Sequence, residues 1–259
     1  MNERIIGIMG AMNEEISSIM ELLSNVKIVY FGMRTYYSGT INDIPVVVVF
    51  SRWGKVAAAT TVTSLITRFN ITDLVFIGVA GAIQPHLRIG DVVVATRLIQ
   101  HDMDARPLIN RHEIPLLNVT YLESNPRHLK IAKEAVQQVI TNQLLSFIPA
   151  DHIERFGLNS TCLYSGDIAS GDRFFANKSD KDALLSLLPH ILCVEMEGAA
   201  VAQVCYEYAI PFVVLRIISD ESNEQSAIDF SDFITSVSSR YAKEIINQMF
   251  LLITKTLNQ

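Results

Sequence analysis

The chain has 259 residues, of which 49% are hydrophobic and 19% charged, and this apolar content supports a large buried core and argues against global disorder. Acidic residues outnumber basic ones by 27 to 21, which gives a net charge of −6. No segment carries a block of Lys or Arg, so nucleic acid and anionic membranes are not expected as partners.

The three cysteines contain no C-x-x-C pair, which argues against a disulfide framework or a zinc cluster. The N-terminus runs directly into a strand-like segment with no signal-peptide pattern. The longest apolar runs are far shorter than the roughly 20 residues that span a bilayer. These features predict a cytoplasmic protein.

Short apolar runs alternate with helical spacing along the chain. In the first half, strands are predicted at 4–9, 26–31, 35–41, 45–50, 73–77 and 91–99, and helices at 13–23 and 54–69. The strand at 73–77 is expected to end in a Gly78–Gly81 turn. A polar stretch at about 102–125 predicts a long loop, which in a compact domain is usually functional or mobile.

The second half continues the alternation. Helices are predicted at 127–141, 178–188 and 195–208, a last helix is predicted to begin near Ser231 as its N-cap, and strands are predicted at 161–169, 191–194 and 211–219. This order favours an α/β fold, with a twisted, mostly parallel central sheet flanked by helices. Since nothing resembles a linker or a repeat, residues 1–259 are expected to form a single domain.

Ligand sites in such sheets lie beyond the carboxyl ends of the strands, and polar residues gather at four of these ends. Glu14 and Glu15 follow the first strand, and glycines flank Val79 and Ala80 after the 73–77 strand. Glu195 and Glu197 follow the 191–194 strand. Taken singly, each group is also typical of an ordinary helix start or tight turn.

The fourth strand end is Arg216-Ile-Ile-Ser-Asp220. Arg216 lies within an apolar run, and a buried arginine needs a partner, for which Glu15 or Glu197 is a candidate. Asp220 stands where a loop begins, so it is either a turn cap or a functional acid. The His101-Asp-Met-Asp104 segment lacks the spacing of a metal site and is more typical of a hydrogen-bonded loop.

Together these segments resemble the 5′-methylthioadenosine/S-adenosylhomocysteine nucleosidase family of the nucleoside phosphorylase superfamily. The matching stretches are IGIMGAMNEEI (6–16), GKVAAA (54–59), GVAGA (78–82), GDVVVA (90–95), SGDRFF (170–175), CVEMEGAAVAQVC (193–205) and RIISDESNEQSAIDF (216–230). They occur in the family's order and cover nearly the whole chain. The resemblance implies a single α/β domain that works as a homodimer without a metal or organic cofactor.

The resemblance also implies roles for individual residues. Glu15 would activate the attacking water, with Arg216 supporting both, and Asp220, oriented by Ser219, would protonate the purine. Glu197 would hold the ribose hydroxyls beside Met196. Phe174 and Phe175 would form part of the adenine slot, and Phe230 would close over the base. Further substrate contacts are expected from Met12, Trp53, Val79, Ala80, Gly81 and Glu195.

The chemistry of N-glycoside cleavage agrees with these roles. A carboxylate near the sugar stabilises developing oxocarbenium charge. Asp220 needs a raised pKa to hold a proton near pH 7, whereas Glu15 must stay ionised to accept one from water. A phosphorylase would need an anion site beside the ribose, and the carboxylates of Glu14 and Glu15 would repel phosphate there.

The activity implied is therefore hydrolysis of 5′-methylthioadenosine and S-adenosylhomocysteine to adenine and a 5-thioribose product, in methionine salvage and removal of S-adenosylmethionine by-products. The alternatives are an aminodeoxyfutalosine nucleosidase of menaquinone synthesis, a phosphate-dependent purine nucleoside phosphorylase, and a nucleoside-binding protein without turnover. The sequence departs from the family at Trp53, where a smaller residue is expected against the 5′ substituent, at Val79, and across 104–124. The 5′ selectivity thus stays open.

Overall fold

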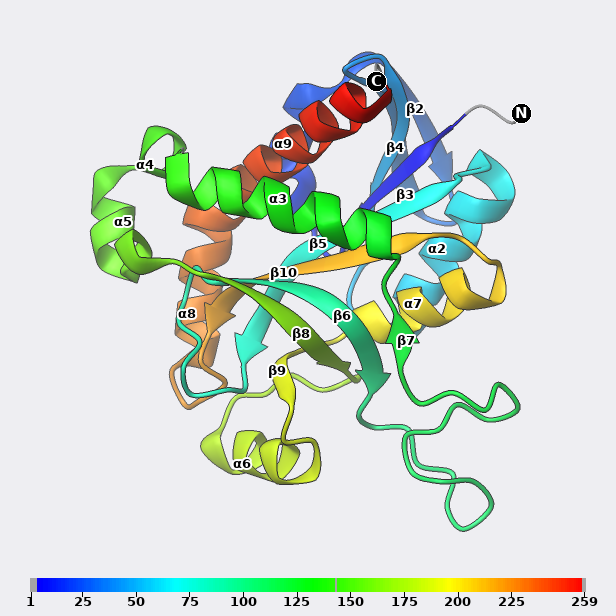
Figure 1. The fold of residues 1–259 in the computed structure, drawn as a ribbon, viewed down its shortest axis with the longest axis vertical. Coiled ribbons are helices and arrows are strands. Elements are labelled where there is room, and N and C mark those ends of the chain that lie inside the picture. Colours follow the sequence, from blue (N-terminus) through cyan, green and yellow to red (C-terminus); the bar gives the residue numbers. More distant parts are fainter. Residues whose placement is uncertain (1–3, 143, 258–259) are drawn as a thin grey trace.

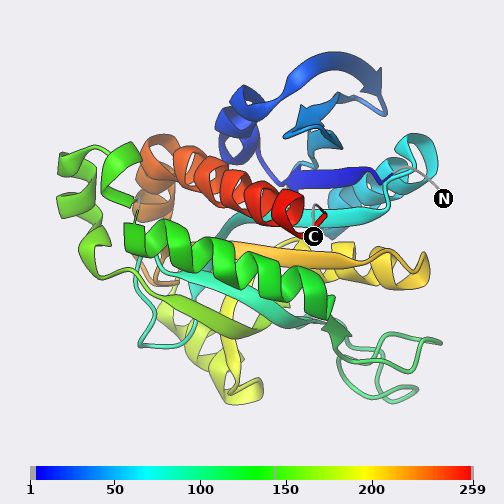
Figure 2. The ribbon, with the colours of Figure 1, turned by 45° about the horizontal axis from the view of Figure 1, so that its top comes forward.

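The computed structural model describes residues 4–142 and 144–257, in which one twisted sheet is covered by helices on both sides (Figures 1 and 2). The strands are β1 (Ile6–Gly10), β2 (Ser24–Phe31), β3 (Arg34–Ile41), β4 (Ile44–Phe50), β5 (Asp73–Ala82), β6 (Val92–Gln100), β7 (Leu122–Glu123), β8 (Leu163–Ser170), β9 (Ile191–Glu195) and β10 (Phe212–Asp220). The expected α/β fold with a central sheet is confirmed.

The helices are α1 (Asn13–Ile16), α2 (Lys55–Phe69), α3 (Pro126–Asn142), α4 (Leu144–Phe147), α5 (Ala150–Phe156), α6 (Lys178–Leu187), α7 (Gly198–Glu207), α8 (Ser226–Phe233) and α9 (Ser239–Leu257). Short 3-10 segments occupy Ser17–Leu22 and Leu158–Ser160, and a π-helical turn, Ile234–Ser238, joins α8 to α9. The last helical region thus begins at Ser226, so the predicted start at Ser231 is wrong. The helices α4 and α5 were not predicted.

Among the described strands the sheet order is β10-β6-β8-β9-β5-β1-β4-β3-β2, and β5 also pairs with β10. The segment from β5 through β9, β8, β6 and β10 therefore closes on itself. Parallel pairs join β1 to β4 and β5, β5 to β10, and β8 to β6 and β9, whereas β2, β3 and β4 form an antiparallel meander. Antiparallel pairs also join β5 to β9, and β6 to β10 and β7, so the sheet is mixed.

The turns of this meander explain its tight connections. Gly32 and Met33 join β2 to β3, and Asn42 and Asp43 join β3 to β4, all four with φ between 48° and 64°. Two consecutive left-handed residues are the mark of a type I′ turn, whose twist matches that of antiparallel strands. The hairpins extend the sheet away from the closed segment.

Two apolar cores lie on opposite faces of the sheet. On one face α3 and α9 pack side by side, and Val136, Tyr241 and Ile245 are buried there (Figure 1). On the other face α2 packs against α7, with Leu65 and Val201 in the core. Every residue of β10 is buried, which explains its nearly continuous apolar sequence. In the described part of the chain, no helix is long and apolar enough to cross a membrane.

The predicted loop at 102–125 extends away from the body of the molecule and ends in β7 (Figure 1). Asp102 accepts a hydrogen bond from Lys55 (2.7 Å), and Asp104 pairs with Arg106 (2.6 Å). These acids are therefore part of a hydrogen-bonded loop. Among the described residues, no group of three or more His, Cys, Asp or Glu is placed to hold a metal ion.

At the amino end of β5, Asp73 joins three elements. Its Oδ1 accepts from Arg4 Nη2 (3.0 Å) and His128 Nε2 (2.7 Å), and its Oδ2 accepts from Thr72 Oγ1 (2.7 Å). Burial alone would raise the pKa of Asp73, but the hydrogen bonds from His128, Arg4 and Thr72 outweigh it and hold that pKa well below its ordinary value. The carboxylate therefore ties α3 and the entry to β1 to the central strand.

We expect Asp73→Asn to lower the free energy of unfolding by about 1–3 kcal/mol at pH 7, because the variant loses charge-assisted hydrogen bonds. Since the native pKa of Asp73 lies below its unfolded value, this stabilisation is present above pH ~4 and declines as the pH falls below that value. Urea unfolding at pH 7 and pH 3.5 checks both effects. Asp43→Asn, in an exposed turn, is the matched control, and an equal effect of both variants would contradict the prediction.

Candidate active site

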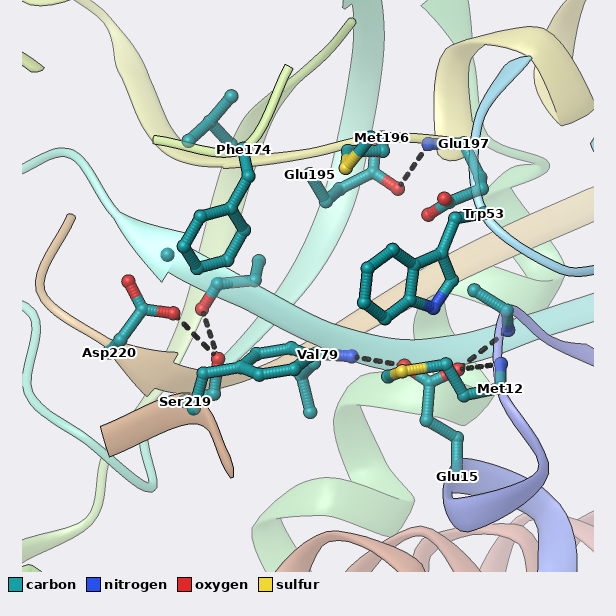
Figure 3. A pocket seen from close by; sticks show the side chains of 15 residues that line it. Met12, Glu15, Trp53, Val79, Phe174, Glu195, Met196, Glu197, Ser219 and Asp220 are labelled. Atoms are coloured by element: carbon teal, nitrogen blue, oxygen red, sulfur yellow. Dashed lines mark hydrogen bonds between the residues drawn. The ribbon is translucent and has the colours of Figure 1, made fainter. Parts of the chain in front are cut away.

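A cavity opens where β1, β5, β9 and β10 end, between α1 and the loop that follows β4 (Figure 3). Thirteen of the predicted site residues line it, and so do Ala11 and Val194, which were not predicted. The thirteen are Met12, Glu15, Trp53, Val79, Ala80, Gly81, Phe174, Glu195, Met196, Glu197, Ser219, Asp220 and Phe230. Ala11 and Val194 each adjoin a predicted strand-end motif, which is the signal that could have found them. Segments far apart in the sequence thus meet at one site.

Two predicted residues lie outside this lining. Phe175 is buried, stacks edge-on against His101 with ring centroids 5.4 Å apart, and lines a smaller neighbouring cavity with Phe174 and Asp220. Arg216 is 1% exposed and lies behind Glu195, with its guanidinium 4.0 Å from the centre of the Phe76 ring. Its influence on the cavity is therefore electrostatic.

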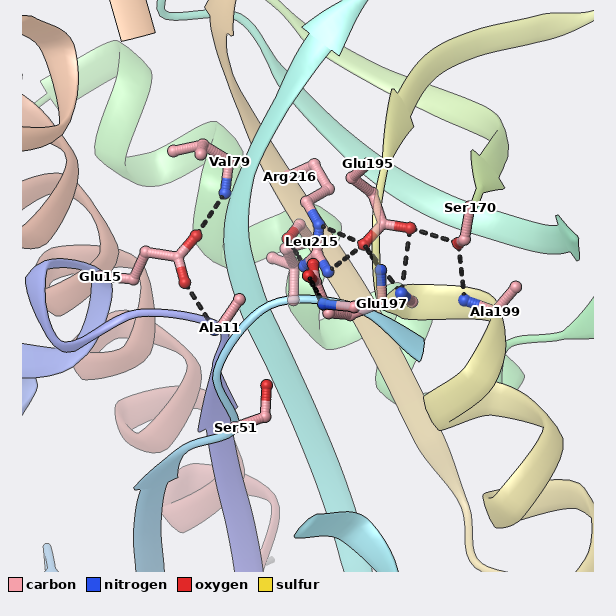
Figure 4. Close-up of polar contacts among 12 residues, drawn as sticks. Ala11, Glu15, Ser51, Val79, Ser170, Glu195, Glu197, Ala199, Leu215 and Arg216 are labelled. Carbon is pink, nitrogen blue, oxygen red and sulfur yellow. Dashed lines mark hydrogen bonds and ion pairs between the residues drawn. The ribbon is translucent and has the colours of Figure 1, made fainter. Parts of the chain in front are cut away.

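The carboxylate of Glu15 is held by three backbone N–H groups. Ala11 N (2.6 Å) and Met12 N (2.9 Å) donate to Oε2, and Val79 N (3.0 Å) donates to Oε1 (Figures 3 and 4). Burial raises the pKa of Glu15, while the charge of Arg216 and these hydrogen bonds oppose the rise. The balance yields a fixed carboxyl whose proton affinity is greater than that of an exposed glutamate.

The predicted Gly78–Gly81 turn is wrong, because β5 continues as a strand to Ala82. The two glycines serve a different purpose. A Cβ at Gly78 would lie 2.5 Å from Oε1 of Glu15, and one at Gly81 would lie 2.3 Å from Oγ of Ser222 and 2.9 Å from Oδ1 of Asp220. Glycine is needed at both positions because the two carboxyl groups approach the strand backbone there.

Asp220 ends β10 and is nearly fully buried. Its Oδ2 accepts from Ser219 Oγ (2.9 Å) and its Oδ1 accepts from Ser222 N (2.9 Å). Burial raises the pKa of Asp220 although these hydrogen bonds oppose it. The side chain can therefore carry a proton at higher pH than an exposed aspartate.

Glu195 and Arg216 form a buried ion pair, in which Nη2 donates to Oε2 at 2.6 Å (Figure 4). The expected partners of Arg216, Glu15 or Glu197, are therefore wrong. Glu195 also accepts from the backbone of Glu197 (3.0 Å) and Gly198 (2.8 Å) and from Ser170 Oγ. Glu195 is the partner because it stands at the end of β9, where its carboxylate can cap α7 and face Arg216 at the same time.

Glu197 stands at the start of α7, and its Oε1 accepts from Gly54 N (2.7 Å). Burial and the negative charge of Glu195 raise the pKa of Glu197 to about 8. The neutral form can both accept from Gly54 and donate through its other oxygen. Glu197 is thus equipped to bind hydroxyl groups.

Phe174, Phe230 and Trp53 form the apolar rim. The rings of Phe174 and Phe230 meet edge-on with centroids 5.7 Å apart, and those of Phe230 and Trp53 do so at 6.3 Å. In Figure 3, Phe174 lies on the Asp220 side of the cavity, and Trp53 lies on the side of Met12. The rim can accept a flat aromatic group near Asp220 and a second apolar group near Trp53.

We expect Glu197→Gln to reduce the loss of stability with rising pH. Because the native pKa of Glu197 is raised, native protein holds a proton that unfolded protein releases, so stability falls as the pH rises from about 4.5 to 8. Glutamine stays neutral. In urea unfolding at pH 5 and 8.5, the free energy of unfolding of the variant relative to the wild type should therefore be greater at the higher pH. Glu221→Gln, at an exposed carboxyl, is the control. A pH-independent difference between wild type and variant would contradict the raised pKa.

Comparison with known proteins identifies the family. The model of the phosphorylase superfamily matches residues 5–250. A 5′-methylthioadenosine/S-adenosylhomocysteine nucleosidase of Oceanobacillus iheyensis is 31% identical, over 94% of this chain and 98% of its own length. An aminodeoxyfutalosine nucleosidase of Helicobacter pylori is 33% identical, over 94% and 99%.

Solved structures agree. The 5′-methylthioadenosine/S-adenosylhomocysteine nucleosidase of Colwellia psychrerythraea, in complex with adenine, superposes with a TM-score of 0.84 and 28% identity, covering 97% of this chain and 96% of its own. The shared fold and the length of the matches leave no large segment of either chain unaccounted for. The chain therefore belongs to the 5′-methylthioadenosine/S-adenosylhomocysteine nucleosidase family of the phosphorylase superfamily.

Proposed function

We propose that this chain, as one nucleosidase domain over residues 1–259, hydrolyses the N-glycosidic bond of 5′-methylthioadenosine and S-adenosylhomocysteine, releasing adenine and a 5-thioribose product. The observation that carries the proposal is the convergence of three buried carboxyl groups, Glu15, Glu197 and Asp220, on one cavity with an aromatic rim. The O. iheyensis relative, which bears this activity in its name, supports the substrate class.

Asp220 is the proposed general acid. Adenine leaves poorly as an anion, so protonation of N7 must accompany cleavage, and a carboxyl whose pKa is raised by burial can supply that proton. Ser219 orients the carboxyl through its 2.9 Å hydrogen bond. The neighbouring Phe174 supports placing the adenine on this side of the cavity.

Glu15 is the proposed base for the attacking water, and Glu197 the proposed ribose ligand beside Met196. Three backbone N–H groups keep Glu15 in place. Burial raises the pKa of Glu15 toward neutral pH, and a general base is most effective when its pKa lies near the working pH. The charge of Arg216 favours the ionised form. Glu197 can hold the sugar hydroxyls, and the positive charge that develops on the ribose during cleavage would favour ionisation of this carboxyl, which in turn stabilises that charge.

Water is the proposed acceptor in place of phosphate. The N–H groups of Ala11, Met12 and Val79 would suit an anion, but Glu15 already occupies them. A phosphate beside this buried carboxylate would meet like charge in a setting of low dielectric constant. The arrangement therefore favours a hydrolase over a phosphorylase.

Aminodeoxyfutalosine is a second candidate substrate, since the H. pylori relative named for that activity is 33% identical. The same acid, base and ribose ligand would serve, because this substrate also carries adenine on ribose. The two substrates differ in the groups beyond the 5′ carbon. Trp53, at the edge of the cavity, is the residue that we expect to contact those groups.

The cellular setting follows from the proposed reaction. We place the enzyme in the cytoplasm, in methionine salvage and removal of S-adenosylmethionine by-products, and propose that it acts as a homodimer. Leu108 and Leu116, on the projecting loop, are 90% and 92% exposed, and burying such side chains against a second copy would be favourable.

The reaction class can be tested directly. Purified protein is incubated with methylthioadenosine in phosphate-free buffer, and adenine is followed by chromatography; parallel samples contain phosphate, S-adenosylhomocysteine or aminodeoxyfutalosine. We expect adenine without phosphate and no acceleration when phosphate is added. Release that strictly requires phosphate would make the protein a phosphorylase, and binding without release would remove the enzymatic proposal.

We expect Asp220→Asn to lower kcat by roughly 10²–10⁴-fold, the usual contribution of a general acid. Asparagine retains an oxygen for the Ser222 N–H, so thermal unfolding should stay near that of the wild type. Asp182→Asn, at an exposed carboxyl of α6, is the matched control and should leave turnover unchanged. Near wild-type turnover in Asp220→Asn would reject the assigned acid.

A further inference from the structure

A groove continues from the catalytic cavity past the Trp53–Phe230 ring pair. The two hollows share four lining residues, Ala11, Met12, Trp53 and Phe230. Since adenine is placed on the opposite, Asp220 side, a substituent on the 5′ carbon would leave the cavity toward Trp53. It would then enter this groove.

The groove carries two opposite charges on a mainly apolar lining. Arg52 contributes a guanidinium from the loop after β4, and Glu14 contributes a carboxylate from the first turn of α1. Both side chains are exposed to solvent. Nη2 of Arg52 donates to the carbonyl of Met33 (2.7 Å), and a guanidinium has five N–H donors, so this bond orients the group and leaves donors for a ligand.

The backbone of Arg52 is in the left-handed region, with φ of 76°. Glycine adopts this conformation readily, whereas other residues are strained there by about 1–3 kcal/mol. The peptide is fixed by Arg52 N donating to Ala11 O (2.9 Å) and Ser51 Oγ donating to Arg52 O (2.7 Å). A long cationic side chain at a position that favours glycine points to a role for that side chain at the rim.

We propose that this groove binds the zwitterionic end of a homocysteinyl substituent, with Arg52 on its carboxylate and Glu14 on its ammonium group. The inference rests on the proposed nucleosidase function and assigns a preference within it. Arginine suits a carboxylate through paired N–H donors, and Glu14 would repel a ligand bearing only a carboxylate. The chain is thereby selective for S-adenosylhomocysteine over the uncharged methylthio substrate.

Arg52→Gly is the cleanest test, because glycine relieves the backbone strain while removing the guanidinium. We expect kcat/KM for S-adenosylhomocysteine to fall roughly five- to tenfold, chiefly through KM, since the contact is equal in ground and transition states. The value for methylthioadenosine should change less than twofold. Arg52→Lys should recover part of the loss. Asn42→Gly, also left-handed (φ 48°) but in the distant β3–β4 turn, is the matched backbone control.

Two analogues separate the charges. An adenosine with a 5′ 3-aminopropylthio group lacks the carboxylate, so Arg52→Gly should not weaken it. One with a 5′ 3-carboxypropylthio group lacks the ammonium, so Glu14→Gln should not weaken it, although the same change weakens S-adenosylhomocysteine. Raising NaCl from 0.05 to 0.5 M should increase KM for the homocysteinyl substrate alone, because these exposed charges are screened.

The inference is overturned if Arg52→Gly changes both natural substrates by the same factor, or neither. It is also overturned if the carboxypropylthio analogue is insensitive to Arg52→Gly. Failure of the proposed function looks different, because the wild-type protein would then release no adenine from methylthioadenosine, a substrate that does not reach Arg52.

Discussion

The ion pair between Arg216 and Glu195 is the constraint around which the site is built. Both side chains are almost fully buried, so each charge depends on the other for its solvation. Glu195 also accepts hydrogen bonds from the first N–H groups of α7, which fixes the start of that helix and with it Glu197. One buried pair thus joins β9, β10 and α7 before any substrate arrives.

This pair also sets the electrostatics of the cavity. The positive charge of Arg216 opposes the rise in pKa of Glu15 and Glu197, and the negative charge of Glu195 reinforces the rise for Glu197. Asp220, at the far end of β10, is raised mainly by its own burial. Three of the four carboxyl groups that line the hollow thus have raised pKa values for different reasons, and carboxyl groups in different environments are the starting point for a division between acid and base.

Much of the fold could be predicted because buried strands are short apolar runs and helices repeat every 3.6 residues. The strand-end motifs also predicted most of the cavity lining, since the carboxyl ends of parallel strands meet at one edge. Sequence could not decide the partner of Arg216, because three acids compete and only their placement in space separates them. It misjudged Gly78 and Gly81, since a glycine that admits a neighbour's carboxyl looks the same as one that makes a turn. It missed α4 and α5, which are too short for a clear period.

The two glycines of β5 fix where two carboxyl groups lie along the strand. Glu15 rests against Gly78 and Asp220 against Gly81, and three residues of strand correspond to roughly 10 Å. A register shift between Ile218 and Asp220 brings Asp220 opposite Gly81. Each of the two carboxyl groups is therefore held against its own point on the β5 backbone. On the proposed roles of Glu15 and Asp220, a substrate whose base accepts its proton at a different distance from the ribose would require a different strand register, whereas changes in the groove beyond Trp53 would leave both contacts in place.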